Sequence, residues 1–527
     1  MSNLGLRVMK LKFILLISAF CALFEAHATK PRLIVNIVVG SMRAEDLNRY
    51  ASNFSEGGFK RLMIGGTVYT DSGYDYQQTT TPVSLATLST GAMPSTHGVI
   101  GARWMDYTTN QSVELISSTE NPSPEQLIAP TISETLLRHA AGSQSVTVAA
   151  EATSAVVMNG RGGSCFWLDQ HCGWTSSKAY IETLPEWITR SNREHYNLSY
   201  VAAEWRTLYD RGRYINKRHW DISLTGKNRK ERTVQGSGRL KHGSDYERML
   251  YTPAGNTAVL GLAKQAIAQY GLGNDEIPDI LNIYLDASRR IVEAYGPESI
   301  EVEDTYYRLD NDLADFLTFL LAQVKNKEVL VVLTSDHGTS PAYDAGSVVA
   351  DRFNERQFEV IVNGFLNARY GTGKWVTAFD SKCLWLNHNL IYERGLNLSE
   401  VQNEVAIFAM QFRGVSHALA ATAMRTSYFG SGYARKLQNS FYPRRSGDVI
   451  LNLMPGWIEE QERVCSTSGS MYGYDTQVPL IFYGAGVGMQ RISRRVDMTS
   501  VAPTLARIAG ISKPAASEGE VLVEIVD

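Results

Sequence analysis

Arg32-Leu-Ile-Val-Asn-Ile-Val-Val39 is a continuous run of mostly β-branched residues. Such a run is typical of a strand buried on both faces, as in a parallel sheet. Segments with helical periodicity, such as residues 302–321 and 498–508, separate further runs of this kind. These lie at residues 145–149, 280–285, 329–334 and 478–483. The alternation predicts an α/β fold with a doubly wound, mainly parallel sheet.

Polar residues follow three of the predicted strands, as Gly40-Ser41-Met42-Arg43, Asp286-Ala287-Ser288-Arg289 and Ser335-Asp336-His337-Gly338. In doubly wound sheets, ligands bind at the carboxyl ends of the strands. Adjacent Asp336 and His337 offer a carboxylate and an imidazole for a divalent metal. The alternative is that Asp336 only caps the turn that follows it.

Thr79-Thr80-Thr81-Pro82 forms a hydroxyl-rich turn before a predicted helix. A hydroxyl at this position faces the positive end of the helix dipole, which favours an anion or a developing alkoxide. Plain N-capping by a threonine explains the same pattern.

The composition is that of a globular protein: 527 residues, 44% hydrophobic and 20% charged. These values exclude a disordered chain, collagen and a coiled coil. The net charge of −3 argues against binding of polyanions over the whole surface.

The N-terminus is typical of an export signal. Arg7, Lys10 and Lys12 precede the apolar run 13–24, and Ala26-His27-Ala28 offers a cleavage site. This run is too short to span a bilayer, which takes about 20 residues. We expect a signal peptide over residues 1–28, cleaved after Ala28, and a periplasmic or secreted mature chain without a transmembrane segment. An N-terminal anchor helix is the alternative.

Residues from about 160 to 260 show no clear period, which predicts a cap inserted into one domain that spans residues 29–527. Within it, residues 205–242 carry eleven Lys or Arg, interleaved with aromatic residues such as Trp205 and Trp220. This stretch is either a solvated face or a surface for an anionic ligand, such as lipopolysaccharide or nucleic acid. Cys165 and Cys172 are close enough in sequence to suggest a disulfide in an oxidising compartment.

Several further motifs follow one another in a fixed order over nearly the whole mature chain. They are Gly57-Gly58-Phe59-Lys60-Arg61-Leu62, the Thr81 turn, Met93-Pro94-Ser95-Thr96-His97-Gly98, Ile300-Glu-Val-Glu-Asp304, Ser335-Asp-His-Gly338, Tyr474-Asp-Thr-Gln-Val-Pro479 and Ala502-Pro-Thr-Leu-Ala506. This set resembles the alkaline phosphatase superfamily, in its phosphate-irrepressible, PafA-like branch. The resemblance implies a doubly wound sheet with two zinc ions. It also implies a threonine nucleophile that forms a phospho-enzyme, which water then hydrolyses.

The resemblance places the nucleophile on Thr81 and two metal ligands on Asp336 and His337. Other family ligand positions carry different residues. The first Asp falls on Gly40, the Asp-x3-His segment on Arg289 and Glu293, and the C-terminal His on Gln477. The family's Lys-x-Arg pair falls near Glu151-Ala152-Thr153, and its substrate-binding Asn falls within residues 101–104.

Three interpretations of the altered positions remain open. Glu293 can serve as a substitute ligand, and Asp286 can serve if the chain is shifted by three residues. Arg103 and Arg289 can instead form an anion pocket, since guanidinium groups suit phosphate or carboxylate. In the third interpretation, both arginines are simply paired with acids.

The leading hypothesis is an exported, catalytically degenerate pseudoenzyme that needs no metal cofactor. It would bind a ligand or an envelope protein through the former cleft or the cap. One alternative is a metal-dependent phosphomonoesterase or phosphodiesterase that acts through Thr81 with one zinc or another divalent metal. A structural component of an envelope complex is the other.

Overall fold

A nine-stranded sheet forms the centre of the computed structural model, which describes residues 30–116, 121–194, 197, 205–216, 244–324, 328–343, 351–461 and 464–526. The strands lie in the order β18-β2-β17-β10-β1-β9-β6-β7-β8. Their bounds are β18 Gln490–Ile492, β2 Thr67–Tyr69, β17 Leu480–Gly484, β10 Val329–Thr334, β1 Leu33–Val39, β9 Asp279–Leu285, β6 Ser145–Ala149, β7 Ser164–Leu168 and β8 Trp174–Thr175. The central strands β10, β1, β9, β6 and β7 run parallel, and β17 is antiparallel to β10. The α/β fold with a mainly parallel sheet is therefore confirmed.

The apolar run of β1 is continuous because helices cover both faces of the sheet. Leu33, Val35, Ile37 and Val39 belong to one core cluster, and Ile34 and Val38 belong to the other. Alternate side chains of a strand point to opposite faces, so each face needs its own apolar set.

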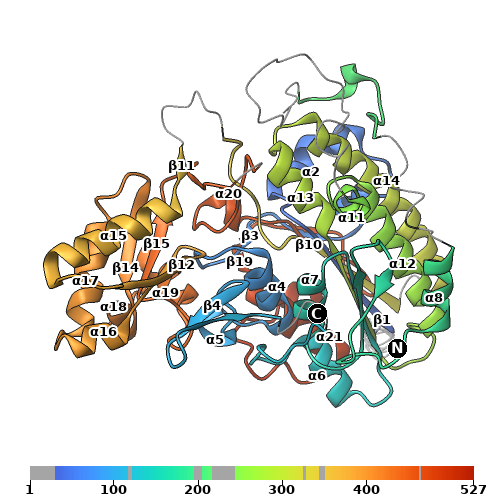
Figure 1. The fold of residues 1–527 in the computed structure, drawn as a ribbon. Coiled ribbons are helices and arrows are strands. Elements are labelled where there is room, and N and C mark those ends of the chain that lie inside the picture. Colours follow the sequence, from blue (N-terminus) through green and yellow to red (C-terminus); the bar gives the residue numbers. More distant parts are fainter. Residues whose placement is uncertain are drawn as a thin grey trace, which may run out of the picture.

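Helices pack on the two faces as two separate layers (Figure 1). One layer contains α2 (Ala44–Tyr50), α3 (Phe59–Gly65), α12 (Ala254–Tyr270), α13 (Asp286–Tyr295) and α14 (Ile300–Gln323). The other contains α4 (Thr81–Thr90), α6 (Ile132–His139), α7 (Ala152–Asn159) and α21 (Val501–Ala509).

A second, smaller sheet with its own core lies to one side of the main sheet, in orange at the left of Figure 1. We call residues 351–461 the subdomain. Its four strands are antiparallel, in the order β12 (Val376–Asp380), β13 (Cys383–Leu386), β15 (Val449–Leu453) and β14 (Val415–Ala420). Its helices include α15 (Glu355–Tyr370), α16 (His388–Glu393), α17 (Leu398–Ala409), α18 (Ala421–Thr426) and α19 (Gly432–Ser440).

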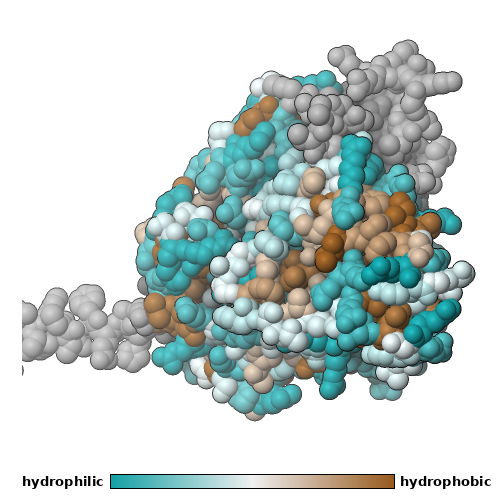
Figure 2. Space-filling view, turned by 90° about the vertical axis from the view of Figure 1, so that its left-hand side faces the viewer, coloured by the Kyte–Doolittle hydropathy of each residue, from teal (hydrophilic) through white to brown (hydrophobic). Residues whose placement is uncertain are grey.

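Figure 2 looks onto the subdomain side of the molecule, where apolar side chains gather among polar ones. Exposed apolar side chains of the subdomain include Val360, Ile407 and Met410.

The expected cap between about residues 160 and 260 is wrong in its bounds. Strands β7 and β8 extend the main sheet, and α12 packs on one of its faces. The sequence did not predict this role. Strands β7 and β8 are short, and the apolar residues of α12 are spread around the helix, so none of the three shows a strong hydrophobic period. The part of the chain that forms a separate sheet with its own core is the subdomain.

Residues 205–216 are held by the acidic motif at the start of α14. Asp304 accepts hydrogen bonds from Trp205 Nε1 and the Leu208 amide, both at 2.7 Å. Glu303 accepts hydrogen bonds from the amides of Ile215 and Asn216, at 2.8 and 2.7 Å. Both carboxylates are fully buried, so this motif anchors the described start of the basic stretch. Most of that stretch, residues 217–242, lies outside the described residues, as does the predicted signal peptide.

The expected disulfide between Cys165 and Cys172 is absent, and both thiols are free and buried. Cys165 belongs to the core on one face of the sheet and Cys172 to the core on the other. Proximity in sequence does not bring the two sulfur atoms together, because the sheet lies between them. Within the part of the chain that the structure describes, no helix is long and apolar enough to cross a membrane.

Candidate functional site

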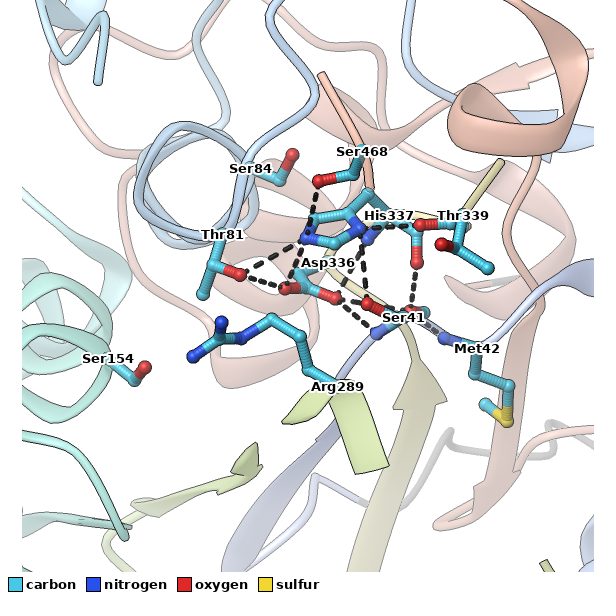
Figure 3. A network of polar contacts seen from close by, with 12 residues as sticks. Ser41, Met42, Thr81, Ser84, Ser154, Arg289, Asp336, His337, Thr339 and Ser468 are labelled. Carbon is cyan, nitrogen blue, oxygen red and sulfur yellow. Dashed lines mark hydrogen bonds and ion pairs between the residues drawn. The ribbon is translucent and has the colours of Figure 1, made fainter. Parts of the chain in front are cut away.

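Thr81, Asp336 and His337 meet at the carboxyl edge of the main sheet (Figure 3). Asp336 and His337 follow β10, and Thr81 is the first residue of α4. Neighbouring parallel strands end at the same edge, so residues far apart in sequence converge there. The structure thus brings together the three residues that the resemblance assigned to the nucleophile and to two ligands.

The Asp336 carboxylate is the centre of this cluster. Its Oδ2 accepts hydrogen bonds from Thr81 Oγ1 at 2.8 Å and from the Tyr284 hydroxyl at 2.7 Å. Its Oδ1 accepts from the amides of Ser41 and His337, both at 2.9 Å. These four donors compensate the burial of the carboxylate.

The imidazole of His337 has one nitrogen fixed and one directed at Thr81. Nδ1 lies 2.6 Å from the carbonyl oxygen of Gly338, which only accepts, so Nδ1 carries a proton. Nε2 lies 3.1 Å from Thr81 Oγ1 and 3.4 Å from Ser468 Oγ. Nε2 also lies 3.1 Å from Asp336 Oδ2, the atom to which the Thr81 hydroxyl donates, so the hydroxyl, the carboxylate and the imidazole are in mutual contact.

Tyr284 is a site residue that the sequence analysis missed. It lies inside β9, one position before the strand ends, whereas only residues beyond each strand were considered. Burial, and then the charge of Asp336, raise the pKa of Tyr284 well above its ordinary value. The hydroxyl therefore stays protonated and donates to Asp336.

Gly40 leaves no room for a ligand side chain. A Cβ atom at this position would lie 2.7 Å from Arg289 Cβ and 2.9 Å from the Tyr284 hydroxyl oxygen. A Cβ atom essentially never lies within 3.0 Å of such a neighbouring atom, so a side chain at residue 40 would force its neighbours to shift. The space beside Gly40 is thus filled by Tyr284 and Arg289.

Arg289 belongs to a cluster of four charged side chains, with Glu151, Arg290 and Glu293. Both arginines form ion pairs with Glu151, which lies directly before α7. Arg289 Nη1 also lies 3.0 Å from Glu293 Oε1, and Arg290 Nη1 lies 3.7 Å from Glu293 Oε2. Two positive and two negative charges balance, so the cluster is neutral as a whole.

The pKa values fit this pairing. Burial alone raises the pKa of Glu151, but Arg289 and Arg290 outweigh it and lower that pKa to about 2. Burial likewise opposes the charge of Arg289, yet Glu293 and Glu151 hold its pKa well above the ordinary value. Glu151 and Arg289 are therefore charged at neutral pH, and all four side chains of the cluster are engaged with one another.

The expected substitutes for the lost ligands are directed elsewhere. Asp286 accepts hydrogen bonds from the Ala150 amide at 2.5 Å and from Ser154 Oγ at 3.0 Å, so it caps the turn before α7. Gln477 is exposed, and Glu293 is paired with two arginines. Both carboxylates are thus engaged by other groups of this chain, and a rebuilt two-metal site that uses Asp286 or Glu293 stays a prediction.

Arg103 and Arg289, for which an anion pocket is one interpretation, are each paired with acids of this chain. Arg103 Nε lies 2.6 Å from Asp380 Oδ2 of the subdomain, while Arg289 is paired with Glu151 and Glu293. Each guanidinium group is engaged by an acid of this chain, as the third interpretation holds.

The donor set does not fit two zinc ions. Thr81 Oγ1, Asp336 Oδ2 and His337 Nε2 converge as three potential ligand atoms. At the four other positions that the resemblance implies stand Gly40 without space for a side chain, Arg289, Glu293 paired with two arginines, and exposed Gln477. A fixed guanidinium group repels a cation. Among the described residues, no group of three or more His, Cys, Asp or Glu side chains forms a candidate metal site.

The fold and the position of the site are those of the alkaline phosphatase type. The sequence profile of the type I phosphodiesterase / nucleotide pyrophosphatase family matches residues 34–475, and the chain belongs to this family. Alkaline phosphatase PafA of Elizabethkingia meningoseptica is 28% identical over 539 residues, which cover 97% of this chain and 98% of that protein. Alkaline phosphatase PhoV of Synechococcus elongatus is 27% identical over 551 residues, with 96% and 94% covered.

Solved structures give the same result. The crystal structure of wild-type PafA superposes with a TM-score of 0.85 at 26% identity, covering 94% of this chain and 99% of that one. Murine ectonucleotide pyrophosphatase / phosphodiesterase 5 superposes with a TM-score of 0.54 at 12% identity over 92% of this chain and 97% of that one, a likeness of fold alone.

Proposed function

We propose that this chain is an exported protein of the alkaline phosphatase fold that no longer carries out the two-zinc reaction. It uses the former cleft to bind a ligand or an envelope protein. The observation that carries the proposal is the packing of Tyr284 and Arg289 against Gly40. A ligand position without space for a side chain cannot supply a carboxylate to a metal.

The charged cluster supports the same proposal. The resemblance implies two zinc ions and a Lys-x-Arg pair at the site of the family. Here Glu151 occupies the region of that pair and neutralises Arg289 and Arg290. The site has lost the excess positive charge that attracts a phosphate dianion.

A retained hydrolase is the second candidate, because the Thr81 hydroxyl still lies 3.1 Å from His337 Nε2. Elemental analysis and hydrolysis of p-nitrophenyl phosphate, with and without added zinc, distinguish the two. We expect no stoichiometric zinc and no chelator-sensitive turnover in the purified mature protein. About two zinc ions per chain with turnover that requires Thr81 would overturn the proposal.

Export is tested separately. The mature N-terminus, read by mass spectrometry of the exported protein, tests cleavage after Ala28.

A further inference from the structure

The loop between β12 and β13 contains two residues in the left-handed region. Asp380 pairs with Cys383, so Ser381 and Lys382 make up a two-residue loop, with φ of 49° and 61°. Loops of this shape favour Asn-Gly, because other side chains are strained at positive φ. Ser381 and Lys382 therefore require contacts that offset the backbone strain.

Lys382 makes such contacts on the side of the loop that faces the site. Its side chain is only 6% exposed, and Nζ lies 2.5 Å from Glu459 Oε1. Nζ also donates to the carbonyl oxygen of Ser468 at 3.4 Å. A Cβ atom on Gly469 would lie 2.9 Å from Nζ and 3.2 Å from Thr80 Cγ2. Gly469 thus leaves room for the ammonium group beside the residue that precedes Thr81.

The segment that Lys382 contacts, residues 468–470, reaches both parts of the site. Ser468 Oγ lies 3.4 Å from His337 Nε2. The carbonyl oxygen of Gly469 accepts a hydrogen bond from Gln77 Nε2 at 3.0 Å. The carbonyl oxygen of Ser470 accepts from Thr79 Oγ1 at 2.9 Å. One short segment therefore connects Lys382 to the imidazole and to the turn before Thr81.

The same loop contacts the turn before Thr81 directly. Gln78 Nε2 donates to the carbonyl oxygen of Ser381 at 3.0 Å. Asp380, at the start of the loop, holds Arg103 at 2.6 Å. The β12–β13 loop of the subdomain is thereby held against the segments that carry Gln78 and Arg103.

We infer that Lys382 is a positioning residue that holds residues 468–470 against His337 and the Thr79–Thr81 turn. Through it, the subdomain is coupled to the site at the edge of the main sheet. The inference goes beyond the proposed function, since it holds whether the site binds a ligand or hydrolyses one.

Hydrogen exchange of the whole mature protein tests this coupling. Lys382→Met removes the ammonium group and leaves Glu459 buried without its partner. We expect amides in residues 466–470 and 77–81 to exchange at least about tenfold faster, while those of α12 keep their rates. Exposed Lys374 lies in the same subdomain, so Lys374→Met is the matched control and changes none of these rates. Unchanged exchange in residues 466–470 would overturn the inference, as would equal acceleration along the whole chain.

Two further variants keep the test decisive. Glu459→Gln is milder, because a neutral amide still accepts from Lys382, and it replaces Lys382→Met if that variant does not fold. It should accelerate exchange in the same two segments, and unchanged rates there contradict the inference. Ser381→Gly relieves strain but retains Lys382, so protection of residues 466–470 should persist. Loss of that protection in Ser381→Gly would assign the effect to the loop conformation and not to the lysine.

Discussion

The hydroxyl of Tyr284 lies 2.7 Å from Asp336 Oδ2 and donates a hydrogen bond to it inside the core. Tyr284→Phe removes this donor and leaves the buried carboxylate with less compensation. We expect the free energy of unfolding to fall by about 1.5–3 kcal/mol, the range for hydrogen bonds to charged groups. Urea denaturation measures the loss. Tyr392→Phe, at an exposed position, is the control and should have no effect.

Gly40→Ala should destabilise the protein by about 1–3 kcal/mol, because its Cβ would overlap Arg289 Cβ and the Tyr284 hydroxyl oxygen. Gly261→Ala in α12 is the control, since its Cβ meets no atom within 4 Å. Thermal denaturation of the two variants compares them directly. Equal stability of Gly40→Ala and the wild type would show that the space beside Gly40 is open.

Arg289→Met should cost about 3–5 kcal/mol, because Glu151 and Glu293 then lose their main partner in a partly buried cluster. Chemical denaturation at neutral pH measures this loss. Arg413→Met, which breaks an ion pair with Asp351 at a side chain that is 79% exposed, should cost less than about 1 kcal/mol. Similar losses in the two variants would contradict the view that the ion pairs of Glu151, Arg289, Arg290 and Glu293 stabilise the fold.

His97 should make the protein less stable in acid. Its Nδ1 accepts from the Val99 amide at 3.1 Å, and its Nε2 lies 3.1 Å from Thr87 Oγ1, so the ring is held neutral. Burial, and then the charge of Arg445, lower the pKa of His97 from 6.5 to about 3. Between these values the unfolded chain binds a proton that the folded chain does not. Stability therefore falls by about 1.4 kcal/mol per pH unit from pH 6.5 down to about pH 3.

The variant His97→Asn tests this assignment, because its amide oxygen can accept from Val99 without titrating. Denaturation curves at several pH values should show a flatter dependence for His97→Asn than for the wild type. His139→Asn, at an exposed position, should keep the steep dependence. Parallel curves for His97→Asn and the wild type would exclude His97 as the source.

Cys165, Cys172 and Cys383 should react with iodoacetamide in denaturant without reductant, since the structure joins none of these three thiols in a disulfide. Mass spectrometry of the peptides with Cys165 and Cys172 provides the readout. Unlabelled Cys165 and Cys172 that become reactive only after reduction would restore the disulfide expected from the sequence.

The sequence predicted the centre of the fold because β1, β9 and β10 are buried on both faces and so carry an unbroken apolar pattern. It also predicted that Thr81, Asp336 and His337 meet, since each follows from a motif at a strand or helix end. Strands of the subdomain are short and belong to a separate antiparallel sheet, so no run of similar strength marks them.

The contacts that decide the chemistry of the site were less accessible. Tyr284 looks like any core residue of a buried strand, and only its hydroxyl partner shows its role. The pairing of Glu151 with Arg289 depends on where α7 and α13 begin relative to each other, which sequence spacing does not encode. The two cysteines illustrate the same limit, because seven positions of chain carry them to opposite faces of a sheet.

The packing around Gly40 also makes residues 40, 284 and 289 depend on one another. An aspartate introduced at residue 40 meets the Cβ of residue 289 whatever that residue is, unless it is glycine, so the helix α13 must move as well. A carboxylate at residue 40 therefore needs coordinated changes at residues 284 and 289, and any single substitution there destabilises the protein.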